Sequence, residues 1–255
     1  MFKDVIEAIG SAARKLFSNW GALLISLLLY AALLGVLYLF ITTSEATTLQ
    51  VVLTVPVLPL ASATLFFSLQ AMGISYVRIG VGALYLLKRA LKDCWRLLLV
   101  TIPLGVAAWL FVHYVGDPDP KWMNPWFETR AWLHRPVGVF WYLLLYLILP
   151  LVAIHWWIAA MREGLVGALK GSLRHVGRAL APRSLLIYLL IVAVFGAAAW
   201  FLFFTKFHVK SEWGDLWLFG TRFALGLLMI FFGWMLTLGA MAEMTARRAI
   251  GELEG

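Results

Sequence analysis

Six long runs of apolar residues divide the chain and are separated by shorter polar stretches. The runs cover residues 20–42, 49–74, 97–115, 137–158, 185–205 and 217–241. Each has about the 20 residues that a helix needs to cross the hydrocarbon core of a bilayer. None contains Asp, Glu or Lys, and Arg222 lies close enough to the start of the last run for its side chain to reach the interface. The pattern predicts an all-α bundle of about six transmembrane helices.

Three polar stretches have the pattern of short amphipathic helices. Residues 8–20, 82–95 and 167–180 place apolar side chains at three- and four-residue spacing, with Lys and Arg between them. Such helices either lie in the inner head-group layer or form a docking surface for a cytoplasmic partner or anionic lipid. The cations that we expect to make these contacts are Lys88, Arg89, Lys92, Arg174 and Arg178.

The amphipathic stretches and the apolar runs alternate in a way that predicts a threefold repeat of amphipathic helix, span, hairpin and span. Ala-Met occurs where each even-numbered run ends, at 71–72, 160–161 and 240–241. Gly-Ala-Leu occurs in the second and third amphipathic stretches. The predicted repeats are residues 1–75, 76–161 and 162–255. No polar linker separates them, so we expect one integral membrane domain over residues 1–255.

The distribution of Lys and Arg predicts the orientation in the membrane. Most of the 21 basic residues fall beside the N-terminus, the C-terminus and the loops that follow the even-numbered runs. Basic residues collect on the cytoplasmic side of membrane proteins. We therefore expect a multi-pass protein of the inner (plasma) membrane with both termini in the cytoplasm.

Composition supports the same class of protein. Hydrophobic residues make up 63% of the chain and charged residues 13%, whereas soluble domains have about 25% charged residues. The net charge of +8 arises beside the apolar runs, which suits anionic lipid head groups better than nucleic acid. A single cysteine, Cys94, excludes an intramolecular disulfide.

The alternation of interfacial helix and hairpin, with the motif GALKGSLRH at residues 167–175 before a span, resembles a group of six-span bacterial membrane proteins. It is similar to the membrane domain attached to some glycerophosphodiester phosphodiesterases and to related uncharacterised inner-membrane proteins. The resemblance implies a fold only, because the soluble catalytic domain of that enzyme has no counterpart in this sequence.

The loop at residues 116–136 is the most distinctive polar segment on the opposite side. It carries aromatic and basic residues at helical spacing, which predicts a short helix on the outer leaflet. Such a helix either anchors the loop in the membrane or contacts another protein. The residues that we expect to make the contact are Trp122, Trp126, Arg130 and Trp132.

Chemistry-bearing motifs are absent from the sequence. There is no GxSxG, HExxH or Walker A pattern, so we expect no enzymatic activity, no metal and no cofactor. His155, beside two tryptophans, is the weak candidate for a pigment ligand. A haem site from His113 with His134 or His208 is conceivable, but hydrogen-bonding histidines at the interfaces are the simpler interpretation.

These observations favour a non-enzymatic membrane protein that serves as an accessory or structural subunit of a larger membrane complex. The partners that we expect are membrane lipids, anionic on the cytoplasmic side, and other membrane proteins. The alternative is a carrier for lipids or small apolar molecules. Spans without mid-depth charge argue against an ion-coupled carrier, and the proline-broken run at residues 49–74 would be a wall of an apolar path.

Overall fold

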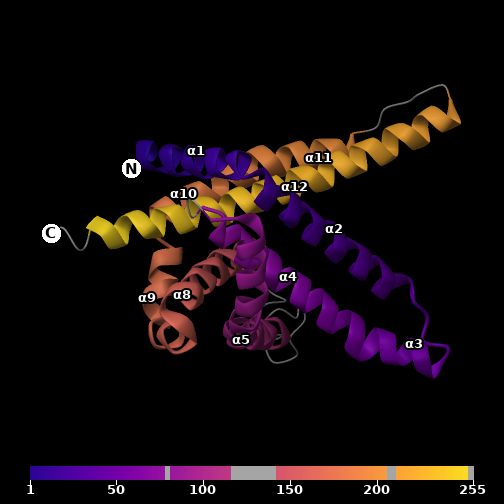
Figure 1. Ribbon diagram of the computed structural model, residues 1–255, viewed down its shortest axis with the longest axis horizontal. Coiled ribbons are helices and arrows are strands. Elements are labelled where there is room, and N and C mark those ends of the chain that lie inside the picture. Colours follow the sequence, from indigo (N-terminus) through magenta and orange to yellow (C-terminus); the bar gives the residue numbers. More distant parts are fainter. Residues whose placement is uncertain (78–80, 116–141, 206–210, 252–255) are drawn as a thin grey trace, which may run out of the picture. The chain divides into compact units, whose positions relative to one another are not determined.

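The computed structural model describes residues 1–77, 81–115, 142–205 and 211–251, and every regular element in these ranges is helical (Figure 1). The elements are α1 (Phe2–Ser18), α2 (Trp20–Thr42), α3 (Thr48–Val52), η1 (Leu53–Val57), α4 (Leu58–Ser75), α5 (Ala83–Val115), η2 (Leu144–Ile148), α8 (Leu149–Lys170), α9 (Ser172–Ala179), α10 (Pro182–Ile191), η3 (Val192–Gly196), α11 (Ala197–Phe204) and α12 (Glu212–Gly251). The all-α prediction is confirmed.

Six helical segments in the described part of the chain are long and apolar enough to cross a membrane, so the chain is a multi-pass membrane protein. They are Trp20–Thr42, Thr48–Ser75, Ala83–Leu110, Leu144–Lys170, Pro182–Phe204 and Glu212–Arg247. The first span has the predicted bounds. The fourth predicted span begins at residue 137, and its first five residues lie outside the described part of the chain. The orientation of the termini stays a prediction.

Three segments in the described ranges are wound as π-helix, and two of them precede the same tripeptide. The segments η1 and η2 each end directly before Leu-Pro-Leu, at residues 58–60 and 149–151. The N–H of Leu58 bonds to the carbonyl of Leu53, and that of Leu149 to Leu144, each five residues back. Proline removes a donor and clashes with the carbonyl four residues earlier, and a wider turn accommodates both effects. The second span of each of the first two predicted repeats thus contains a π-helical turn directly before Leu-Pro-Leu.

The three amphipathic stretches take three different forms. In the first, Asn19 separates α1 from α2, and its side chain accepts a hydrogen bond from the N–H of Ala22 (3.1 Å). In the second, α5 continues without a break from the amphipathic part into the span. In the third, α8 bends at Gly164 before the short helix α9. The junctions between amphipathic stretch and span therefore differ from one another, and the threefold repeat stays a prediction.

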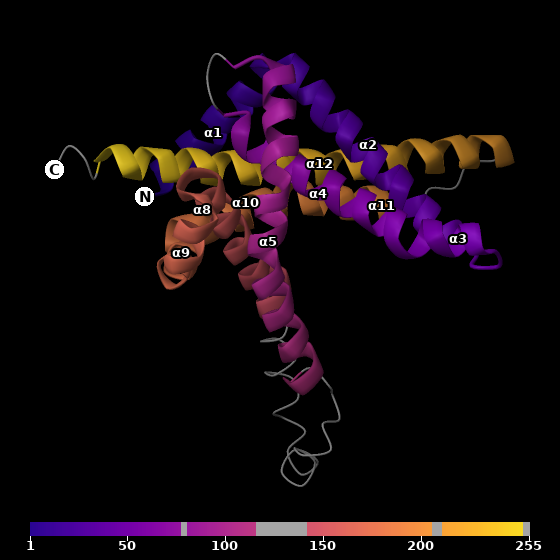
Figure 2. The ribbon, with the colours of Figure 1, turned by 60° about the horizontal axis from the view of Figure 1, so that its bottom comes forward.

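The chain forms two compact units, residues 1–94 with 185–255 and residues 95–184. In the first unit, α2 and α4 form a hairpin closed by α3, and α11 packs beside α12 (Figures 1 and 2). Where α4 ends, the hydroxyl of Tyr76 donates to the carbonyl of Met235 (3.2 Å) in α12. A Cβ at Gly239 would overlap that hydroxyl, so this crossing requires glycine.

Helix α1 lies along α12 rather than standing free (Figure 1). Its buried residues are Val5, Ala8, Ala12 and Leu16, a single seam in which two alanines let the helices approach closely. Helix α12 has 40 residues and is thus about 60 Å long, twice the hydrocarbon thickness of a bilayer. It therefore projects beyond the apolar core, and α1 covers part of that projection. The sequence analysis did not predict this protein cover for the first amphipathic helix.

In the second unit, α8 packs against α9 and is joined to α5 by a buried tryptophan. The indole N–H of Trp157 donates to the hydroxyl of Thr101 (2.7 Å), which itself donates to the carbonyl of Leu97 (2.6 Å). The bend in α8 depends on Gly164, whose φ of 78° and ψ of 177° form the only positive-φ conformation among the described residues. Residues with a Cβ are strained in this region.

The conformation of Gly164 leads to the first prediction. Gly164→Ala should lower the free energy of unfolding by about 1–3 kcal/mol through backbone strain, because no atom lies within 4 Å of the added Cβ. The matched control is Gly177→Ala in α9, where the added Cβ is equally unobstructed but the backbone is helical. The control should be neutral or stabilising by up to about 1 kcal/mol. Thermal unfolding in detergent micelles measures both, and equal shifts would contradict the prediction.

Candidate functional site

The residues predicted to contact lipid or partners fall into three groups in the structure. Trp122, Trp126, Arg130 and Trp132 lie outside the described residues. Lys88 and Lys92 are exposed near the start of α5, where Arg89 forms an ion pair with the buried Asp93 (3.5 Å). In the second unit, Arg174 is exposed and Arg178 half-buried on α9. The contacts of these cations with lipid or partner stay predictions.

His155 is held in a hydrogen-bond chain in the second unit. It is buried in α8, and its Nε2 lies 3.1 Å from the hydroxyl of Ser184. That hydroxyl donates its one proton to the carbonyl of Arg178 (2.9 Å), so the imidazole must donate to Ser184 from Nε2. The ring therefore ties α8 to the start of α10. This assigns His155 a structural contact, and its role as a pigment ligand stays a prediction.

His175 and Glu163 form a polar pair at the bend between α8 and α9 that sequence reasoning missed. The imidazole is buried, and its Nε2 lies 3.7 Å from a carboxylate oxygen of Glu163. Burial lowers the pKa of His175 because desolvation opposes the charged ring. Glu163 opposes this shift, and Arg178 and Arg174 add to it. The pair is 12 residues apart in the sequence, and only the bend at Gly164 brings it together.

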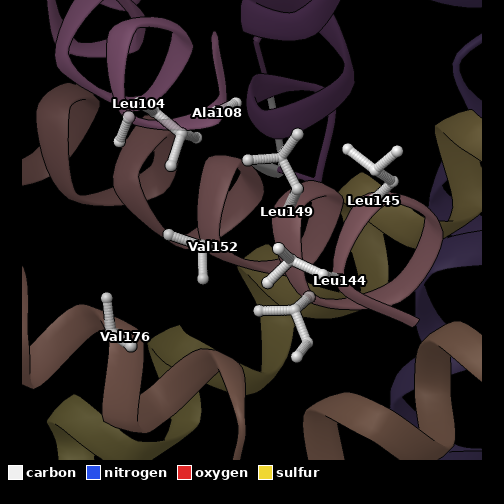
Figure 3. Close-up of a pocket in the computed structure, with 9 residues that line it drawn as sticks. Leu104, Ala108, Leu144, Leu145, Leu149, Val152 and Val176 are labelled. Atoms are coloured by element: carbon white, nitrogen blue, oxygen red, sulfur yellow. The ribbon is translucent and has the colours of Figure 1, made fainter. Parts of the chain in front are cut away.

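An apolar cavity of about 270 Å³ lies within the second unit (Figure 3). Its walls are aliphatic side chains of α5, η2 and α8, closed on one side by Val176 of α9. The lining residues are Leu104, Ala107, Ala108, Leu144, Leu145, Ile148, Leu149, Val152 and Val176. Since every lining side chain is apolar, the cavity suits a hydrocarbon chain and offers no group for catalysis or for holding a metal.

Charged residues pin α1 to α12 in the first unit. The ammonium of Lys15 donates to Glu243 (2.7 Å), and the other oxygen of this carboxylate accepts from Ser11 (3.4 Å). Arg247 lies 3.5 Å from Glu243 and 3.6 Å from Glu7. Both side chains of the central pair are mostly buried, which strengthens their attraction relative to a surface pair. The sequence shows the i,i+4 spacing of Glu243 and Arg247 but not their contact with Lys15, because α1 and α12 come from opposite ends of the chain.

No group of three or more His, Cys, Asp or Glu side chains in the described ranges is placed to hold a metal ion. His113 stacks on Trp109 (centroids 5.2 Å apart), while His134 and His208 lie outside those ranges, so the haem hypothesis is not resolved by the structure. The carbonyl of Thr205 at the end of α11 accepts from Arg222, so this cation within the last span has a protein partner.

The charged cluster on α1 and α12 gives the second prediction. Lys15→Met should lower the free energy of unfolding by about 1.5–3 kcal/mol, because it leaves a mostly buried carboxylate short of its closest donor. Arg14→Met is the control, since Arg14 is exposed and bonds only to the backbone of its own helix. It should change stability by less than about 0.5 kcal/mol. A Lys15 variant as stable as the control in thermal unfolding would refute the role of the cluster.

The buried His175 gives the third prediction. Its pKa in the folded chain lies below the ordinary value of about 6.5, so the unfolded chain binds the proton first. The stabilisation is present above pH 6.5 and is lost as the pH falls through the folded pKa. The unfolding temperature should therefore drop between pH 7.5 and pH 5, roughly the range in which histidine titrates. In His175→Gln this drop in unfolding temperature should disappear. Parallel curves for the wild type and the variant would show that His175 does not cause the pH dependence.

Comparisons of the chain with family models, with curated proteins and with solved structures found no match. The resemblance to the membrane domain of glycerophosphodiester phosphodiesterases accordingly stays a prediction from the sequence.

Proposed function

We propose that this multi-pass membrane protein is a non-enzymatic subunit that associates with a larger complex in the cell's inner membrane. The observation that carries the proposal is the apolar surface that the spans of the first unit leave uncovered. Of the 23 residues of α2, only Ala22, Leu23, Ser26 and Leu33 are buried. In α11 only Ala199 is buried. Helices exposed to this extent offer large faces to lipid or to the helices of another protein.

These faces consist of large apolar side chains that either lipid or a helix of another protein can cover. Large side chains such as Leu28, Tyr38 and Ile41 project from α2 and are 69%, 67% and 80% exposed. Association of helices in a membrane relies on packing of such surfaces and on occasional polar contacts, since the lipid offers no hydrophobic driving force. A subunit that binds no small-molecule substrate needs only exposed faces of this kind and a stably folded frame of helices.

The α1–α12 pair supplies the frame. The mostly buried ion pair of Lys15 and Glu243 and the alanine seam of α1 hold an amphipathic helix against the projecting part of α12. The outward face of α1 remains charged and accessible, as the exposure of Lys3, Glu7 and Arg14 shows. This end of the first unit can therefore meet the polar surface of a partner while the spans meet its membrane part.

A carrier for lipids or small apolar molecules is the second candidate function. The apolar cavity of the second unit favours it, because a hydrocarbon segment would fit a space lined by aliphatic side chains alone. The volume of about 270 Å³ lies just below the usual range for ligand pockets, which suits a chain better than a bulky solute. The proline-broken second span was the wall expected from the sequence, whereas the cavity lies in the other unit.

Site-specific photo-crosslinking tests the subunit proposal and is the fourth prediction. A benzophenone side chain in place of Leu28, on the open face of α2, should form a crosslink to a defined membrane protein in native membranes. The same group in place of Leu33, which is 7% exposed, is the control and should crosslink within the chain. Mass spectrometry identifies the products. Adducts with lipid alone from Leu28, and from Ile41 as a second probe, would count against a complex.

A further inference from the structure

The apolar cavity of the second unit borders the basic helix α9. Eight of its nine lining residues belong to the spans Ala83–Leu110 and Leu144–Lys170, and the ninth is Val176 of α9. One wall of the cavity is thus formed by an amphipathic helix outside the spans. Figure 3 shows Val176 of α9 across the cavity from the side chains of the two spans.

Helix α9 presents three distinct faces. His175 and Ala179 are buried against the protein. Leu173 and Leu180 are 87% and 42% exposed and, at 100° per residue, share a face with Val176. Arg174 and Arg178 lie on the opposite face. This layering is that of an interfacial helix, whose apolar side enters the acyl region while its cations lie at the level of the phosphates.

The charge around α9 is strongly positive. Residues 162–183 contain five Lys or Arg residues and a single carboxylate, Glu163. That carboxylate lies 3.7 Å from the ring of His175 and is thus directed partly toward the protein. Each cation near the surface raises the affinity of such a cluster for anionic lipid head groups roughly fivefold.

We propose that the second unit binds one anionic phospholipid, with an acyl chain in the apolar cavity and its head group in the layer of Arg174 and Arg178. The apolar lining excludes a peptide, because its backbone groups would be buried without hydrogen-bond partners. The acyl chain of a phospholipid has no such groups, and its anionic head group matches the charge of α9. The site does not depend on the proposed role as a subunit, and a carrier and a subunit with a resident lipid would both possess it.

Lipid retention by the purified chain tests this proposal as the fifth prediction. The protein is reconstituted in vesicles of equal dioleoyl-phosphatidylglycerol and dioleoyl-phosphatidylcholine, extracted again in mild detergent, and its bound lipids are quantified by mass spectrometry. The wild type should retain phosphatidylglycerol in excess. Arg174→Gln with Arg178→Gln should lower the ratio of the two lipids by about fivefold per cation. Lys3→Gln with Arg14→Gln, which removes two exposed cations of α1 that are not among the predicted lipid contacts, is the matched control and should retain the wild-type ratio.

A second pair of variants tests the cavity independently of charge. Ala108→Phe should fill the space and lower the total lipid retained severalfold, while Val106→Phe on the half-exposed side of the same helix should not. Size-exclusion chromatography confirms that each variant is folded. Retention of both lipids in the vesicle ratio by the wild type, equal losses in the two double variants, or equal retention by the two phenylalanine variants would overturn the proposal. Because no other protein is present, these results are independent of the crosslinking experiment.

Discussion

Within a bilayer every backbone N–H and C=O group must find its hydrogen-bond partner inside the protein, and this constraint governs the whole structure. It explains why every described element is a helix and why π-helical turns accompany the prolines at the two Leu-Pro-Leu tripeptides. At Pro56 and Pro150 the chain avoids a broken helix by widening a turn. At the end of α11 the carbonyl of Thr205 accepts a hydrogen bond from the guanidinium of Arg222. A cation in a span is stable here because it satisfies the backbone.

The same constraint acts on polar side chains, and two of them are paired across helices in the first unit. Trp234 of α12 donates to the amide of Gln70 in α4 (2.6 Å), and Tyr30 of α2 donates to the carbonyl of Leu227 (3.3 Å). Each pair joins two spans of the first unit. Interhelical hydrogen bonds of this kind contribute modestly, roughly 0.6 kcal/mol on average, but they fix which faces meet. The apolar remainder of each span is left to lipid or to a partner.

The sequence predicted the number of spans because the thickness of the membrane sets the minimum length of an apolar run. It predicted the bounds of α2 at 20–42, where Asn19 acts as a helix cap that can be recognised in the sequence. It did not predict that α5 and α12 continue far beyond their apolar parts. Nothing at residues 94–96, Cys-Trp-Arg, interrupts backbone hydrogen bonding, and hydropathy reports the surroundings of a helix rather than its end.

The candidate sites were predicted in part for a related reason. The periodicity of apolar and basic residues identified the cations of α9, because residues on one face of a helix lie close together in the sequence. The partners of Lys15, His155 and His175 come from distant residues, so only the fold could reveal Glu243, Ser184 and Glu163. The cavity is likewise invisible in the sequence, because its aliphatic lining residues look like those of any span.

The π-turns before the two Leu-Pro-Leu tripeptides also determine how the residues that follow are rotated about the helix axis. Each residue advances an α-helix by about 100°, so the extra residue held in a π-turn rotates everything beyond it by that angle relative to an uninterrupted helix. In α4 the rotated part carries Gln70 toward Trp234, and in α8 it carries His155 toward Ser184. The direction in which Gln70 and His155 point thus depends on the number of residues in the preceding π-turn. Deletion of one residue from that turn would rotate these side chains toward the lipid.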